Sequence, residues 1–298
     1  MRYYIIYVVC SSFIFSNELS FNTLWGQCTL INQSALSSTD IINAINQEIQ
    51  TMYNSYGPIP KNKFSIEIGN NKHILSKHPH WKWSLGFTYH YPDKIFIKDP
   101  ALSKIGWGKF KKVIAHELNH IMLNRISYHH KIPRWFKEGV AMKIANEISM
   151  YHKLKIASNT NNAMLFNLEE YSEFKDMSKQ EFHFAYSISS ASIILLEKIY
   201  GYNTIDRIIE NLINGQTFQE SFYNSTGFEI SDFYEIFYNE IKKHFFWFKF
   251  INLPKNLFAI MPLILIIGFY IKSYKNKKIV KQWELEEELE NMEDLDIN

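Results

Sequence analysis

Cysteine is scarce in this chain of 298 residues, which contains only Cys10 and Cys28. Two thiols cannot supply the disulfide framework that stabilises many small secreted domains. Stability must therefore come from a hydrophobic core, and 46% hydrophobic residues with 16% aromatic residues are enough to build one. Because the bulky Gln27 precedes Cys28, we expect an unmodified thiol there rather than a lipidated one.

An excess of positive charge is also absent, since the formal net charge is +2. Nucleic-acid binding requires a basic patch or stripe, so nucleic acid is excluded as a partner. Internal repeats and long low-complexity tracts are missing as well, which argues against a solenoid or a repeat array. The economical interpretation is a single main globular domain over residues 28–244.

The start of the chain, MRYYIIYVVCSSFIFS, has one positive residue followed by an apolar run of signal-peptide length. We predict that residues 1–27 form a signal peptide or an N-terminal anchor. Cleavage is expected near Ser16 or near Gly26-Gln27, and an uncleaved anchor remains open because neither site has small residues at both key positions. The alternative is an ordinary buried N-terminal strand.

A second apolar run, LFAIMPLILIIGFYI at residues 257–271, carries no charge and lies between Lys255 and Lys272. A spanning helix usually needs about 20 residues, but snorkelling lysines and neighbouring aromatic residues extend its reach. We predict a transmembrane helix at 257–271 and a charged cytoplasmic tail at 272–298, with a buried core helix as the alternative. The central domain is then extracytoplasmic, either periplasmic or at the cell surface, in a single-pass membrane protein.

Between these ends the pattern is a sheet first and helices afterwards. A helix capped by Thr39 or Asp40 and ended by Gly57 precedes alternating, aromatic-rich strands at 64–68, 84–91 and 94–98. Helical periodicity then predicts helices at 107–126, 133–149, 184–200, 204–214, 217–224 and 231–244. This order predicts an α+β fold in which a small mixed sheet is followed by a mainly helical part.

The first of these later helices contains VIAHELNHIML, in which polar residues interrupt a strongly apolar run. His116 and His120 are four residues apart, so both imidazoles project from one face, about one turn apart. That separation suits two ligands of one zinc ion. Glu117 can reach an open coordination position, where a carboxylate accepts a proton from water. Two ordinary core histidines are the alternative interpretation.

A third ligand is available on the following helix, within PRWFKEGVA. Glu138 is placed to complete the set, although a solvated carboxylate would be the default interpretation without the histidine pair. Two imidazoles and one carboxylate leave a position of a tetrahedral zinc open for water, which is the catalytic arrangement. His129 and His130 follow Ser127-Tyr128 rather than the glycine of a metzincin pattern, so we assign them to a solvated loop.

At these residues the sequence resembles the gluzincin metallopeptidases, and most closely the bacterial Peptidase MA-like group. The matching features are AHELNH, PRWFKEGVA and the segment FAYSISSASIILLEKIYG, with NTIDRIIENLINGQTFQESFYNSTGFEISDFYEIF resembling the closing helices of that group. The resemblance covers roughly residues 93–244. It implies a zincin-like fold and a zinc peptidase that acts on peptide or protein substrates. Together with the apolar segments near both ends, this predicts a membrane-anchored peptidase.

The resemblance also implies roles for individual residues. His116, His120 and Glu138 match the zinc ligands, and Glu117 matches the general base. Tyr186 matches a residue that stabilises the oxyanion, with His183 in reserve.

The family further places an edge strand of the sheet above the zinc, where an extended peptide pairs with it, and residues 94–98 are the candidate. A plain edge strand with protective lysines is the alternative. Met142 stands where thermolysin-like members carry an acidic residue that orients a histidine, so that partner must come from elsewhere. The rival function is a catalytically inactive, membrane-tethered binding or assembly module with a zincin fold.

Overall fold

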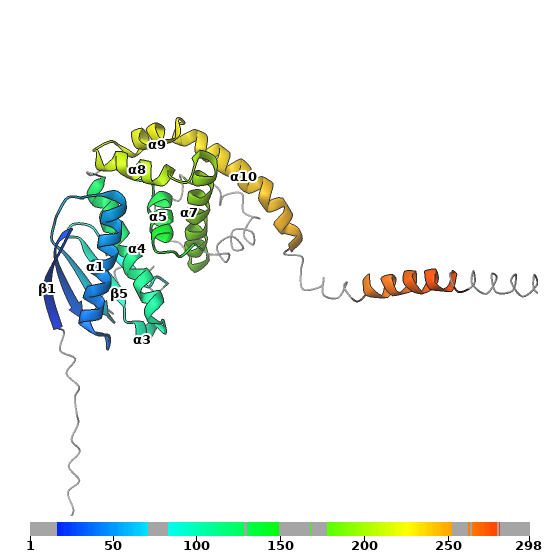
Figure 1. Ribbon diagram of the computed structural model, residues 1–298, viewed down its shortest axis with the longest axis horizontal. Coiled ribbons are helices and arrows are strands. Elements are labelled where there is room, and N and C mark those ends of the chain that lie inside the picture. The colour runs from blue at the N-terminus through cyan, green and yellow to red at the C-terminus, as the bar shows by residue number, and fades with distance from the viewer. Residues whose placement is uncertain are drawn as a thin grey trace, which may run out of the picture. The chain divides into compact units, whose positions relative to one another are not determined.

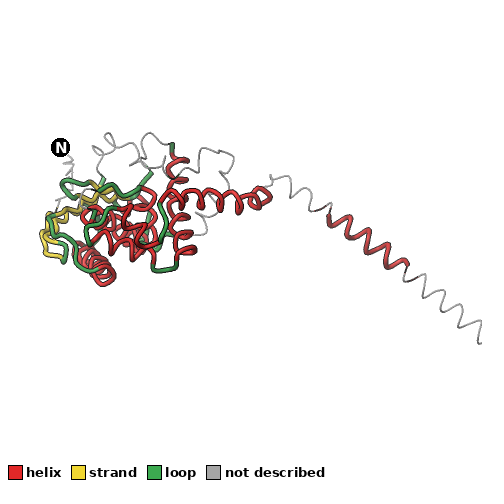
Figure 2. The backbone as a smooth tube through the Cα atoms, turned by 90° about the horizontal axis from the view of Figure 1, so that it is seen from above, coloured by secondary structure: helices red, strands yellow, loops and turns green. Residues whose placement is uncertain are grey.

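The computed structural model describes residues 17–70, 83–127, 130–148, 168, 178–251, 262, 264–278 and 280. The chain forms two compact units, Met1–Phe245 and Phe246–Asn298. Figure 1 shows the first unit as a sheet with helices packed on it and further helices beyond, as the order of elements in the sequence predicts. The strands lie together at one end of this unit when it is seen from above (Figure 2).

A five-stranded mixed sheet forms the first layer of this unit. Its strands are β1 (Asn17–Thr23), β2 (Gly26–Asn32), β3 (Phe64–Gly69), β4 (Gly86–Tyr89) and β5 (Lys94–Lys98), and their order is β1-β2-β3-β5-β4. The neighbouring pairs β2–β3 and β3–β5 are parallel, whereas β1–β2 and β4–β5 are antiparallel. The mixed sheet expected from the sequence is confirmed.

The hairpin of β1 and β2 is the main departure from the expected organisation. Asn17 pairs with Asn32 at one end and Thr23 with Gly26 at the other, and Trp25 in the turn is buried. Gly26 has a positive φ of 120°. A Cβ at this position would lie 2.4 Å from the carbonyl oxygen of Asn62, so the turn requires glycine. Residues 17–27 therefore belong to the sheet, although they lie before the predicted domain start at residue 28.

A domain boundary at residue 27 would cut through this hairpin. Residues 1–16 lie outside the described part of the chain, so a leader or anchor there stays a prediction. Cys28 is fully buried in β2, and burial raises the pKa of its thiol to about 12. A protonated, enclosed thiol agrees with the unmodified cysteine expected from the sequence.

Helices α1 (Ser38–Tyr56) and α4 (Trp107–Ile126) cover one face of the sheet (Figure 1). The short helix α3 (Pro100–Ser103) lies between β5 and α4 in the sequence. Ser37 caps α1 and accepts a hydrogen bond from the backbone N–H of Asp40, so the cap lies two or three residues before the predicted one. One continuous core joins the sheet to these helices through buried aliphatic residues, including Ile45, Ile49, Ile66, Ile68, Ile95, Ile97, Ile114 and Leu118.

The remaining helices are α5 (Arg134–Ile144), α7 (Lys179–Tyr200), α8 (Thr204–Ile213), α9 (Phe218–Thr226) and α10 (Ile230–Ile251). Helix α7 starts five residues before the predicted residue 184, because Ser178 and Glu181 form a capping box. Helix α5 ends five residues before the predicted residue 149. The other helices agree with their predicted ranges at most ends, although α10 continues to Ile251.

Among the described residues, no helix combines the length and the apolar character needed to cross a membrane. Within the predicted span 257–271, residues 257–261 and 263 lie outside the described part, and residues 264–271 are helical and exposed. Of the predicted charged tail at 272–298, residues 279 and 281–298 also lie outside the described part.

Candidate metal centre

Helix α4 carries three polar side chains of the centre in the middle of its length. It is buried on most sides, with Phe110, Ile114 and Leu118 fully enclosed, and His116 and Glu117 are buried as well. The rings of His116 and His120 lie 4.9 Å apart between centroids. The helical spacing therefore places both imidazoles on one face, as the sequence predicts.

Helix α5 brings the third side chain to this face. Oε2 of Glu138 lies 3.4 Å from Nε2 of His116 and 3.4 Å from Nε2 of His120. One potential ligand atom from each of the three residues lies within 4.8 Å of the others. The structure thus brings together the three residues expected to bind the metal.

The spacing of these atoms fits a zinc ion. With zinc-to-ligand bonds of about 2.0–2.1 Å, two ligands of a tetrahedral ion lie about 3.3–3.4 Å apart. Oε2 of Glu138 matches that separation from both imidazoles but is too distant for a good hydrogen bond with either. It is also buried without a hydrogen-bond partner among the described residues. A shared cation would satisfy this oxygen, and two nitrogens with one carboxylate form a donor set typical of catalytic zinc.

The charges at this position also favour a cation. Burial lowers the pKa of His116, but the carboxylates of Glu138 and Glu147 on its two ring nitrogens and the charge of Glu117 outweigh burial and raise the pKa to about 10. The pKa of Glu138 lies well below its usual value because the imidazoles and Arg134 outweigh the effect of burial. Three carboxylates therefore surround two imidazoles, an arrangement that a divalent ion stabilises.

The partner that orients His116 is Glu147, which the sequence analysis did not identify. Nδ1 of His116 lies 3.0 Å from Oε2 of Glu147, and Lys109 bonds the other carboxylate oxygen of Glu147 at 2.7 Å. Glu147 follows the end of α5, where Lys112 donates to the carbonyl oxygen of Asn146 at 2.6 Å. This loop carboxylate supplies the contact that Met142 cannot. In the sequence, Glu147 is recognisable only as an acidic residue shortly after the PRWFKEGVA motif.

The strand β4 holds Glu117. The hydroxyl of Thr88 donates to Oε2 of Glu117 at 2.6 Å. A Cβ on Gly86 would lie 2.5 Å from Oε1 of Glu117, so only glycine leaves room for this carboxylate. Burial raises the pKa of Glu117, and both imidazoles oppose that rise. The carboxylate is thus enclosed between α4 and β4.

Tyr186 reaches the centre from α7. Its ring stacks on His116 at 6.2 Å between centroids, with 28° between the planes. Burial, the negative charges of Glu138 and Glu117 and contact with Glu138 raise the pKa of Tyr186 well above its usual value, so the phenol stays protonated. His183 lies one turn earlier on α7, and both residues line a cavity beside the metal-binding candidates. Both tyrosine and histidine candidates therefore lie near the three ligands.

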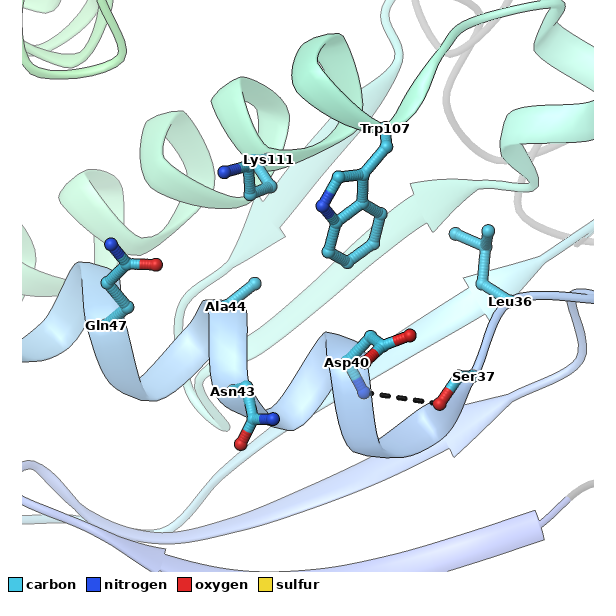
Figure 3. A pocket seen from close by; sticks show the side chains of 8 residues that line it. All are labelled: Leu36, Ser37, Asp40, Asn43, Ala44, Gln47, Trp107 and Lys111. Atoms are coloured by element: carbon cyan, nitrogen blue, oxygen red, sulfur yellow. Dashed lines mark hydrogen bonds between the residues drawn. The ribbon is translucent and has the colours of Figure 1, made fainter.

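That cavity has a volume of about 190 Å³ and opens beside His116 and Glu117. Its walls include apolar and aromatic side chains from the segment before β4 and from α4, α5 and α7, namely Trp83, Leu85, Val113, Met142, Phe182 and Tyr186. A larger groove of about 540 Å³ lies between the N-terminal halves of α1 and α4, where Trp107 and Lys111 face Asp40 and Gln47 (Figure 3). None of the metal-binding candidates lines this groove, so the larger cavity volume does not identify the candidate site.

The prediction that residues 94–98 form the edge strand is wrong. This segment is β5, which pairs with β3 on one side and with β4 on the other. The strand at the edge beside the centre is β4, because β5 inserts between β3 and β4. His130 is exposed in the loop before α5, as expected, and His129 lies outside the described residues.

A family model described as the Peptidase MA superfamily matches residues 43–243, more than half of the chain. This chain belongs to the Peptidase MA superfamily. Membership confirms the resemblance noted in the two zinc motifs and supports the activity proposed below. The match extends from α1 through α10 and therefore includes every residue of the metal centre.

No curated protein sequence matches this Peptidase MA superfamily member. Solved structures do match, among them a mutant of the M1 zinc metallopeptidase from Deinococcus radiodurans. The two chains are 10% identical with a TM-score of 0.37, and the match covers 71% of this chain and 47% of that one. This chain therefore spans less than half the length of that enzyme.

Proposed function

We propose that this protein hydrolyses peptide bonds at the centre formed by His116, His120 and Glu138, with Glu117 as general base. The observation that carries the proposal is the position of Oε2 of Glu138, which lies 3.4 Å from Nε2 of both imidazoles and has no hydrogen-bond partner among the described residues. Zinc held by these side chains supplies Lewis acidity toward water and toward a carbonyl oxygen.

Three further side chains are proposed to transfer the proton, stabilise the developing negative charge and orient a ligand. Glu117 takes a proton from the attacking water and passes it to the amine that leaves when the carbon–nitrogen bond breaks. The Tyr186 hydroxyl, kept protonated by burial and neighbouring carboxylates, donates to the oxygen that becomes negative in the transition state. Glu147 holds the His116 ring in one orientation throughout.

The surroundings of the centre suit a peptide in extended conformation. Strand β4 is bonded to β5 on one side, and no described strand pairs with its other side, so a peptide can add there as a further strand. The neighbouring cavity, walled by Trp83, Phe182 and Met142, fits one apolar side chain of that peptide. Peptides with an aliphatic or aromatic residue beside the scissile bond are the proposed substrates.

We also propose that residues 257–271 tether the domain to a membrane on its extracytoplasmic side. The run is uncharged and is followed by lysines, which supports a cytoplasmic flank. Carbonate extraction of membranes from expressing cells tests this. The full chain should stay in the pellet, and its release into the supernatant would contradict the tether.

The substitution Glu117→Gln in the full-length chain tests the catalytic role. Zinc content should remain at one ion per chain, while peptide cleavage falls by about 10²–10⁴-fold, the usual contribution of a general base. Exposed Glu210 on α8 offers a matched control, Glu210→Gln, which should keep full activity. Turnover retained in Glu117→Gln would remove Glu117 from the mechanism. A wild-type chain that binds zinc but cleaves no peptide would favour the inactive binding module.

A further inference from the structure

We propose that Thr88 is a positioning residue that fixes the general base, so that strand β4 sets the place of Glu117 relative to a bound peptide. This inference rests on the proposed function and adds to it a residue that neither zinc motif contains. Thr88 lies in the middle region of β4, outside the two helices that bind the metal.

The contact between the two side chains is short and enclosed. Oγ1 of Thr88 lies 2.6 Å from Oε2 of Glu117 and 3.2 Å from the main-chain oxygen of the same residue. Both residues are buried, with 9% and 5% of their surface exposed. A hydroxyl that donates to a carboxylate away from water forms a stronger bond than an exposed one. It selects one rotamer of a side chain that otherwise has three rotatable bonds.

Gly86 lies on the same face of β4 as Thr88 and leaves space for the Glu117 carboxylate. Side chains two residues apart in a strand point to the same side, so Gly86 and Thr88 both face α4. A Cβ at residue 86 would meet Oε1, Cγ and Cδ of Glu117 at 2.5–2.9 Å. Thr88 therefore holds one carboxylate oxygen while Gly86 leaves space for the other.

A second contact near the end of β4 keeps the strand in place along α4. The amide nitrogen of Asn124 lies 2.6 Å from Nδ1 and 2.7 Å from Nε2 of His90, and it donates to the main-chain oxygen of His120 at 2.5 Å. Burial and the charge of Lys137 lower the pKa of His90 to about 4, so its ring is neutral and can accept this bond. The strand is thus attached to α4 beside the base and beside a metal-binding histidine.

These contacts connect substrate binding with the base. A peptide that adds to the edge of β4 lies about 4.8 Å from that strand, the usual spacing between neighbours. Because Glu117 is attached to the same strand, the distance from its carboxylate to the scissile bond follows from the strand register. Thr88 acts through Glu117, and its loss should lower kcat far more than it alters KM.

The test compares Thr88→Val, which keeps the side-chain shape without the hydroxyl, with Thr88→Ser, which keeps the hydroxyl. Thr29→Val is the matched control, because Thr29 lies on β2 with only an exposed contact to Ser20. Activity is measured on the full chain with the quenched fluorogenic peptide that the wild type cleaves fastest from a mixed library. Zinc content and thermal unfolding are measured for every variant.

Thr88→Val should lower kcat by about 10²-fold, as a displacement near 1 Å does, with KM within about twofold and one zinc ion per chain. Thr88→Ser should recover most of the loss, and Thr29→Val should match the wild type. Equal kcat in Thr88→Val and wild type would overturn the proposal, as would a Thr88→Ser variant no better than Thr88→Val.

A readout independent of turnover is the crystal structure of Thr88→Val. The Glu117 carboxylate should leave its position between residues 86 and 88, and an unmoved carboxylate would also overturn the proposal. The variant Glu117→Gln distinguishes a failure of the proposed function from a failure of the positioning role of Thr88. If Glu117→Gln is inactive while Thr88→Val is normal, the proposed function stands and only the positioning role fails. If Glu117→Gln is fully active, the proposed function fails first.

Discussion

Helices α4 and α5 provide the two halves of the metal centre, but they fix their side chains in different ways. Helix α4 supplies His116, Glu117 and His120 from the middle of a long buried helix. Helix α5 is shorter, with 11 residues, and supplies Glu138 from its interior and Glu147 from the loop beyond its end. The first half depends on helical periodicity, whereas the second depends on contacts between elements.

The difference shows which parts of the centre depend on tertiary structure. Within α4, residues four apart share a face wherever the helix forms. The Glu147 carboxylate reaches His116 only because Lys109 and Lys112 hold the loop after α5 against α4. Helix α5 in turn depends on its close packing against α7 at Gly139. Substitutions in α5 and its loop should therefore affect the metal through position as well as through lost ligands.

The largest effect on metal binding from the α5 side is expected for Glu138→Ala. It removes one of three ligands, so zinc affinity should fall by more than the 10–100-fold typical of residues that only support a ligand. Competition with a chromophoric chelator measures the affinity, and the exposed Glu210→Ala on α8 is the control. Wild-type affinity in Glu138→Ala would show that another side chain completes the site.

A smaller effect is expected for Glu147→Ala, which removes the partner of His116 without removing a ligand. Zinc affinity should fall by about 10–100-fold, because the ring loses its preferred orientation. Lys109→Gln breaks only the ion pair to the other carboxylate oxygen and should weaken affinity less. The same chelator assay ranks the three proteins. Equal loss in both variants would mean that the ion pair, rather than the bond to His116, orients the ligand.

The sequence predicted the α4 half of the centre well. The HELNH spacing was enough to place His116 and His120 on one face, and Glu138 followed from a second helix of plausible length. The order of elements also predicted the mixed sheet and the later helices, because hydrophobic periodicity is a local signal. The catalytic roles of Glu117 and Tyr186 stay predictions.

The parts that were missed depend on contacts between distant residues. Residues 94–98 look like an edge strand, since lysines flank an apolar centre, but strand order is not encoded in a local pattern. Strand β1 and the turn after it follow an apolar start, so the sequence predicts that they belong to a leader or anchor that ends at residue 27. Thr88 and Glu147 reach the centre only through the sheet register and a loop. Neither position has a spacing that points to a metal.

Packing between α5 and α7 can be compared directly with an open position on α4. A Cβ at Gly139 would lie 2.4 Å from Cγ1 of Ile193 and 2.5 Å from the carbonyl oxygen of Ser189. Gly139→Ala should therefore destabilise the fold by about 1–3 kcal/mol, as overpacking does. At Gly108 on α4 no atom lies within 4 Å of the added carbon, so Gly108→Ala should be neutral or slightly stabilising.

Thermal unfolding measures both glycine variants under the same conditions. For a domain of this size, about 1 kcal/mol corresponds to a Tm change of about 2–4 °C. A fall in Tm for Gly139→Ala with none for Gly108→Ala is the expected pattern. Equal Tm values would show that α7 moves away from α5 at no cost, and the position of Glu138 would then need another explanation.

The smallest effect concerns a buried residue of α4 that is not one of the metal-binding candidates. Asn119 is fully buried, and neither side-chain polar atom has a hydrogen-bond partner among the described residues. An unsatisfied buried amide costs about 1–3 kcal/mol, so Asn119→Leu, of similar size, should raise stability by about 1 kcal/mol. Chemical denaturation gives the difference, and zinc affinity should not change. A destabilised Asn119→Leu protein would instead mean that this amide has a polar partner, and α4 would then be fixed on both of its faces.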